Sequence, residues 1–160
     1  MTDTLERAAL GLFEDLRSML PGLHVAINPE DPNVEISVEI PQQPGLAFAV
    51  HLNFQNRDEL HLGAGDFWGS WFPSSDHDVI ERYREAVLGV ISGQYRIVEY
   101  RRWGSRARAI LQAPRPEGWH TVAKSARGVL ALLPFRWGES ERILQNERPS
   151  NNEMQRTKHG

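Results

Sequence analysis

Three side chains in the first half of the chain could together bind a metal ion. Glu35, His51 and His61 lie on stretches in which apolar and polar residues alternate, a pattern typical of strands with one polar face. In an antiparallel meander with Glu35 opposite His51, His61 lies diagonally from His51. A zinc ion needs imidazole and carboxylate ligands converging at about 2.0–2.2 Å. The pattern therefore allows a small metal-dependent enzyme.

A solvated polar sheet face explains the same three residues without any ligand. The sequence has no dense ligand spacing such as H-E-x-x-H, and no segment carries a cofactor signature. We therefore expect a protein without a cofactor and keep the metal site of Glu35, His51 and His61 as the alternative.

A cluster of arginines around one turn is the second candidate site. Its residues are Arg96, Arg101, Arg102, Arg106 and Arg108, with Trp103 among them. A tight turn at Trp103-Gly104 sets Arg101 or Arg102 across from Arg106, and like charges in such positions are mildly destabilising. We therefore expect an acidic group beside them: the protein's own acidic half, a second copy, an acidic partner protein, or nucleic-acid phosphates.

Charge is sorted along the chain, which bears on that choice. Residues 1–93 carry 15 Asp and Glu against 5 Lys and Arg, whereas residues 94–136 carry 2 against 9. The formal net charge of −3 hides this asymmetry. Because the pI of about 6.1 is unlike that of a dedicated nucleic-acid module, we favour an acidic protein partner or a homodimer.

Aromatic residues crowd the segment 66–73, DFWGSWFP. We expect this segment to be a loop linking a sheet to a helix. Its rings could clamp the helix onto the sheet, since each buries about 150–250 Å². Alternatively, Trp68 and Trp71 could protrude and join the arginines as partner-binding residues, because tryptophan is enriched in interface hot spots.

Two amphipathic helices must frame these candidate sites. Apolar residues recur at helical spacing over 5–20, and Pro21-Gly22 stops that run. A second helix is predicted over 76–92, where acidic residues suit the helix start and Gly93 suits its end.

Period-two alternation between the helices predicts four strands in a meander. The strands fall within 23–27, 34–40, 46–54 and 60–62, separated by segments rich in turn formers. With all apolar sets on one face, the simplest registers oppose Ile27 with Val34, Ile40 with Leu46, and Phe54 with Leu60.

After the second helix, three more strands are predicted over 95–102, 106–113 and 118–124. The apolar stretch 128–137 fits either a helical turn or a strand that Pro134 breaks. We therefore predict an α+β fold, α-β-β-β-β-α-β-β-β, with one antiparallel sheet of about seven strands and both helices packed on one face. Residues 1–137 form a single domain in this prediction, and 138–160 a polar, flexible tail.

Composition restricts the function further. The chain has 160 residues and no cysteine, which excludes disulfides, thiolate zinc sites and cysteine nucleophiles. No apolar run approaches the ~18–20 residues of a membrane span, and we expect a cytoplasmic location. The layout resembles bacterial secretion chaperones and immunity-type proteins at the level of fold alone. We therefore expect a non-catalytic protein that presents the arginine hairpin and the aromatic loop to a protein partner.

Overall fold

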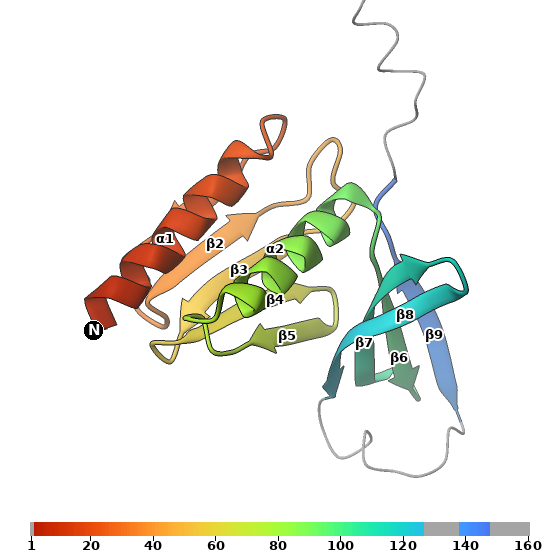
Figure 1. Ribbon diagram of the computed structural model, residues 1–160. Helices are drawn as coiled ribbons and strands as arrows, with labels where there is room; N and C mark the ends of the chain where they lie inside the picture. Colours follow the sequence, from red (N-terminus) through yellow and green to blue (C-terminus); the bar gives the residue numbers. More distant parts are fainter. Residues whose placement is uncertain (1, 127–137, 148–160) are drawn as a thin grey trace, which may run out of the picture.

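The computed structural model describes residues 2–126 and 138–147. Over these residues the chain forms two helices and two antiparallel sheets, so the predicted α+β class is confirmed (Figure 1). The elements are α1 Thr2–Ser18, β1 Ala26–Asn28, β2 Ile36–Ile40, β3 Val50–Gln55, β4 Glu59–Ala64, β5 Phe67–Trp71, α2 His77–Ser92, β6 Arg96–Arg102, β7 Ser105–Arg115, β8 Gly118–Ala126 and β9 Glu139–Leu144.

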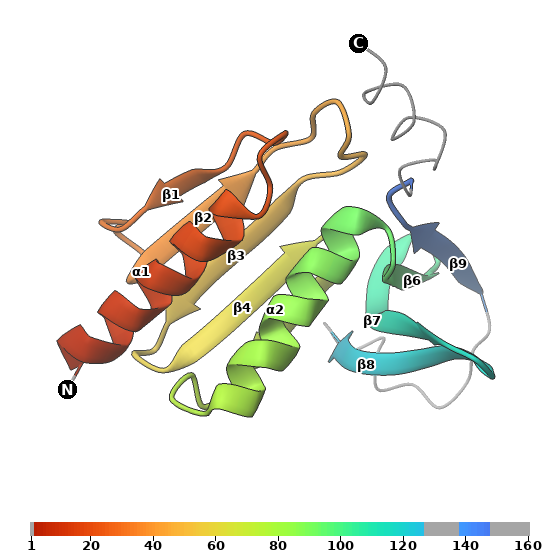
Figure 2. The same cartoon turned by 45° about the horizontal axis from the view of Figure 1, so that its top comes forward.

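The first sheet is a meander of β1 to β5 in sequence order, and both helices lie over one of its faces (Figures 1 and 2). Helix α1 packs on the β2 side and α2 on the β5 side. The helices bury Phe13, Leu16 and Tyr83 against the apolar face of the strands, which includes Val38 and Leu62. The opposite face of this sheet is therefore left to the polar residues of the alternating pattern.

The second helix matches its prediction closely. Asp76 is the N-cap, and its carboxylate accepts hydrogen bonds from the amides of Asp78 and Val79. The helix ends at Gly93, whose φ of 76° is left-handed. These two residues fix the bounds of α2, as capping chemistry predicts.

The prediction of one sheet of about seven strands is wrong, because the strands divide into two sheets. The second sheet has the order β8-β7-β6-β9 and lies beyond β5, beside the first sheet (Figure 1). One of the two unpredicted strands is β5, which occupies most of the segment predicted as an aromatic loop. Phe67, Gly69 and Trp71 of this strand are buried, but Gly69 interrupts the apolar alternation and Trp68 puts an aromatic on the other face.

The other unpredicted strand, β9, lies within the predicted tail. It pairs with β6, with Ile97 opposite Leu144 and Val98 opposite Ile143. Asn146 beyond it is buried: its amide donates to the Val90 carbonyl at 3.1 Å and accepts from the Ala47 amide at 2.7 Å. The expectation of a tail from 138 is therefore wrong for 139–147, where four charged side chains in β9 and its flank mask the strand pattern. The stretches 128–137 and 148–160 lie outside the described residues.

Of the three predicted registers, Phe54 opposite Leu60 is confirmed. The other two are wrong, since Ile27 lies opposite Val38 and Ile40 opposite Val50.

Both register predictions are wrong because the β1–β2 and β2–β3 connections are longer than the predicted turns. Between β2 and β3, Gln43 and Leu46 form their own small bridge, so Leu46 precedes the strand rather than starting it. The Gln43 side chain also hydrogen-bonds the amide and the carbonyl of His24, in place of strand pairing there. The prolines at 41 and 44 lack the N–H groups that would continue the ladder.

Candidate functional site

The arginine cluster lies on the β6–β7 hairpin, as predicted. Trp103 and Gly104 form its turn with φ values of 49° and 77°, and Arg101 lies directly opposite Arg106. A register shift next to Arg101 selects it, rather than Arg102, as the residue facing Arg106. We call residues 101–106 the hairpin tip.

An aspartate from the first half of the chain lies between these two arginines. The carboxylate of Asp66 accepts from Arg101 Nε at 2.9 Å and Nη2 at 3.1 Å, and it lies 2.8 Å from Arg106 Nε. Its side chain is only 4% exposed. The backbone amide of Asp66 donates to Glu99 Oε1 at 2.7 Å, so the β4–β5 turn rests directly on β6. Of the acidic groups that could lie beside the arginines, the structure therefore shows one from the protein's own acidic half, Asp66.

The other arginines of the cluster also have defined contacts. Glu139 of β9 lies 3.1 Å from Arg108 and 3.8 Å from Arg102. The guanidinium of Arg108 stacks over the ring of Tyr100 at 3.7 Å. Such contacts hold long side chains in one conformation, which lowers the entropy cost of any later contact.

Arg96 lies at the far end of β6 from the tip. It stacks on Trp119 of β8 at 4.2 Å and donates to Gln112. Arg96 is thus positioned separately from Arg101 and Arg106. Trp119 was not among the predicted site residues, because only the β7–β8 register brings it into this sheet.

Trp103 is the most exposed large hydrophobic residue in the described part of the chain, at 68%. Its amide donates to the Gly138 carbonyl at 3.1 Å, and a side chain at position 138 would collide with the indole. Its neighbour in the hairpin tip, Arg106, has a side chain that is 57% exposed. The hairpin tip thus exposes a tryptophan and an arginine, two residue types that are enriched in interface hot spots.

The two tryptophans of the aromatic segment take a different environment. Trp71 is 8% exposed and makes an edge contact with the ring of Tyr83 at 5.4 Å, between sheet and helix. Trp68 covers Gly63 and lies 5.5 Å from the ring of His61. The contact of Trp71 corresponds to the clamp interpretation, whereas Trp68 lies on the sheet face turned away from the helices. Phe72, just after the strand, is instead 64% exposed.

The predicted metal trio is not brought together. His51 lies opposite Glu39 and Gly63, while His61 lies opposite Asn53. Glu35 accepts a hydrogen bond from the Arg57 amide at 3.0 Å instead. The predicted pairing of Glu35 with His51 is therefore wrong, because the β2–β3 connection shifts the register. Across residues 2–126 and 138–147, no three His, Asp or Glu side chains are arranged to hold a metal ion.

His61 has an unusual environment all the same. It is buried, at 5% exposure, and its Nε2 lies 3.1 Å from Glu59 Oε2. Its other ring nitrogen, Nδ1, is buried with no hydrogen-bond partner in the described structure, and the same holds for Oδ1 of Asn53 across the strand. Sequence alternation places both residues on the polar face, but it does not reveal that they are buried.

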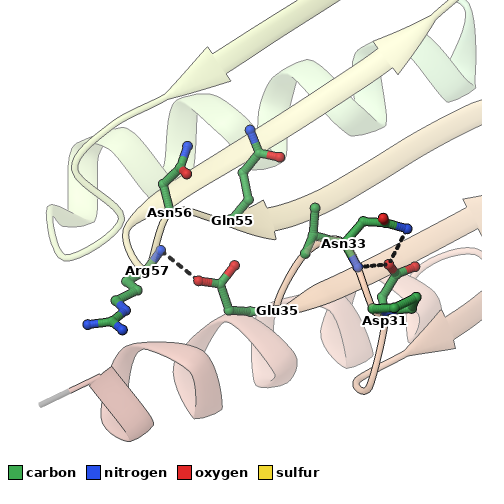
Figure 3. Close-up of a pocket in the computed structure, with 8 residues that line it drawn as sticks. Asp31, Asn33, Glu35, Gln55, Asn56 and Arg57 are labelled. Carbon is green, nitrogen blue, oxygen red and sulfur yellow. Dashed lines mark hydrogen bonds between the residues drawn. The ribbon is translucent and has the colours of Figure 1, made fainter.

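An open groove of about 700 Å³ lies at one end of this sheet. Figure 3 shows Asn56 and Arg57 on one side of it and Asp31 and Asn33 on the other, with the Glu35 carboxylate directed at the Arg57 amide. The lining is Asp31, Pro32, Asn33, Val34, Glu35, Gln55, Asn56 and Arg57.

Hydrogen bonds keep one of these carboxylates ionised. The backbone amide of Asn33 and then the Ser37 hydroxyl donate to Asp31, which lowers the pKa of its carboxyl below the ordinary aspartate value. The groove therefore keeps negative charge at mildly acidic pH.

Comparison with known proteins finds no matching family model, no matching curated protein and no matching solved structure. Neither described helix has the length and apolar character that a membrane span requires.

Proposed function

We propose that this protein is a non-catalytic binding protein whose hairpin tip contacts an acidic surface on a protein partner. The observation that carries the proposal is the 68% exposure of Trp103 on a tip where Asp66 already fixes Arg101 and Arg106. Tryptophan and arginine dominate the binding energy of protein interfaces.

The charge of the tip supports an acidic partner. One aspartate is shared by Arg101 and Arg106, so this group of three keeps one positive charge. Arg101 and Arg106 are 37% and 57% exposed, and their field extends into solvent. Complementary charge on a partner would accelerate association and favour the correct orientation.

Preorganisation supports the same conclusion. Binding normally costs about 0.5–1.5 kcal/mol for each long side chain that it immobilises. Here Asp66 already holds the two guanidinium groups, and the Gly138 carbonyl holds the backbone of Trp103. Binding of a partner therefore loses less free energy to immobilising the residues of the hairpin tip.

The partner in this proposal is an acidic protein surface, either on another protein or on a second copy of this chain. A homodimer and a cytoplasmic location stay part of the proposal. The second predicted surface, that of Trp68 and Trp71, is left out, because Trp71 is buried and Trp68 lies against Gly63.

Affinity capture with matched variants tests the proposal. Trp103→Ala and Arg106→Gln should each lose a protein that the native chain retains, and retention should weaken as salt rises. Phe72→Ala is the matched control, since it removes a similarly exposed ring elsewhere. Equal retention by Trp103→Ala and native protein contradicts the proposal. Light scattering of the purified chain separates the two partners, because a dimer that Trp103→Ala dissociates identifies a second copy.

A further inference from the structure

Most side chains on the sheet face turned away from the helices are polar. The strand registers arrange it in rows: Ala26, Glu39, His51, Gly63 and Trp68 in one, Asn28, Ser37, Asn53, His61 and Ser70 in the next, and Gln55 with Glu59 in a third. The groove of Figure 3 adjoins the third row through Gln55. Groove and rows therefore form one continuous surface, which we call the polar face.

The polar face carries negative charge of its own. Its carboxylates are Glu39 and Glu59 on the strands and Asp31 and Glu35 in the groove. None of its strand positions is a lysine or an arginine, and Arg57 of the β3–β4 turn is the one cation lining the groove among the described residues. An anionic ligand would be repelled from such a surface, whereas a cation is favoured.

Two buried atoms on this face have no hydrogen-bond partner within residues 2–126 and 138–147. His61 Nε2 faces the Glu59 carboxylate, which can only accept, so we assign the proton to Nε2. In the neutral imidazole, Nδ1 of His61 is then an acceptor, as is Oδ1 of Asn53 on the neighbouring strand, and neither has a partner in the described structure. A buried acceptor left unpaired is destabilising. A ligand that donates hydrogen bonds would remove this cost.

The surroundings provide space and an aromatic wall. The groove of about 700 Å³ is open rather than enclosed, and it offers room for part of a small ligand beside the row that holds Asn53 and His61. Gln55 is two residues from Asn53 on the same face, about 7 Å along the strand. The ring of Trp68, 5.5 Å from that of His61, could face a cation.

We propose that the polar face binds an organic cation that carries several N–H donors, with a primary ammonium or a guanidinium group. The positive charge meets the carboxylates of Glu35 and Glu39, and the N–H groups satisfy Asn53 and His61. A free polyamine and a lysine or arginine side chain of another protein share this chemistry. This inference is independent of the partner proposed for the hairpin tip.

The test is a titration of the full chain, followed by amide NMR. The probes are spermidine, a short arginine-containing peptide amide, and tetramethylammonium, which has the charge but no N–H group. We expect saturable shifts with spermidine or the peptide at Asn53, Gln55 and His61, and none with tetramethylammonium. Tighter binding of the peptide than of spermidine would assign the cation to a protein side chain, and the reverse order to a free polyamine.

Variants locate the site. Glu35→Gln and Glu39→Gln keep the side-chain shape and should each weaken spermidine or peptide binding about fivefold. Glu117→Gln, at the exposed β7–β8 turn, is the matched control and should bind as the native protein does. Equal weakening by Glu117→Gln, equal binding of tetramethylammonium, or shifts that never saturate would each overturn the inference.

Discussion

Asp66 and Arg101 join the two sheets through a two-point ion pair, although they are 35 residues apart in the sequence. Asp66 belongs to the turn between β4 and β5, and Arg101 to β6 of the second sheet. The same carboxylate also contacts Arg106 across the hairpin. One side chain therefore relieves the repulsion between two arginines and sets the position of the hairpin tip relative to the first sheet.

Asp66→Asn should destabilise the fold. The change removes a buried negative charge and leaves Arg101 and Arg106 facing each other without compensation. Both arginines are partly exposed, and water screening limits the loss to about 2 kcal/mol. Urea unfolding followed by circular dichroism measures the free energy. Asp78→Asn, an exposed aspartate in the first turn of α2, should change it by less than about 0.5 kcal/mol. Similar values for the two variants would contradict the assigned role of Asp66.

Asn146→Ala should also lower stability, by about 2 kcal/mol. The buried amide of Asn146 connects the end of α2 with the loop before β3. Alanine would remove the acceptor of the Ala47 amide and one of the two donors to the Val90 carbonyl, which keeps the Gly93 amide. Thermal unfolding measures the loss. Gln42→Ala, on an exposed loop, serves as the control. If the two variants unfolded at the same temperature, residues 145–147 would not be docked as described.

The carboxyl of Asp31 should titrate below the ordinary pKa of an aspartate. Its pKa is lowered by the Asn33 amide and then by the Ser37 hydroxyl. A lowered folded-state pKa gives stability that is present above the unfolded-state pKa and is lost as the pH falls through the folded-state value. Carboxyl carbon NMR measures the midpoint, and Ser37→Ala should raise it. An unchanged midpoint in Ser37→Ala would refute the contribution of the hydroxyl.

Tyr83 should resist ionisation until the protein unfolds. Burial raises the pKa of its phenol well above the ordinary value of 10.0, and its hydroxyl donates to the His61 carbonyl at 2.8 Å. Because the folded-state pKa is raised, the neutral phenol of Tyr83 contributes to the stability of the fold. This contribution is complete below the pKa of an unfolded tyrosine and is lost as the pH rises toward the folded-state pKa. Ultraviolet absorbance during alkaline titration should show one of the three tyrosines ionising together with unfolding. In Tyr83→Phe that late step should disappear.

The sequence predicted the elements whose signals are local. Asp76 and Gly93 mark the two ends of α2 by their own chemistry, and Phe54 and Leu60 flank a short turn that leaves little choice of register. By contrast, β9 depends on pairing with β6, and its charged residues resemble a tail when they are considered alone.

For the candidate sites too, local sequence signals predicted one part, and only the fold shows the rest. The crowding of Arg101 and Arg106 predicted that an acidic group would be present, but only the fold identifies Asp66, from another sheet, as that group. The metal trio failed for a related reason. It depended on pairing Glu35 with His51, and the bridge between Gln43 and Leu46 shifts that pairing to Glu39.

Site-specific photo-crosslinking shows whether Trp103 lies against a binding partner. A photoreactive phenylalanine analogue replaces Trp103 in the full chain, and the same analogue replaces Phe72 in a parallel sample as the control. We expect position 103 to form a discrete adduct with one acidic protein or with a second copy of this chain, and position 72 to form none. No adduct at 103, or the same products from both positions, would contradict the proposed role of the hairpin tip.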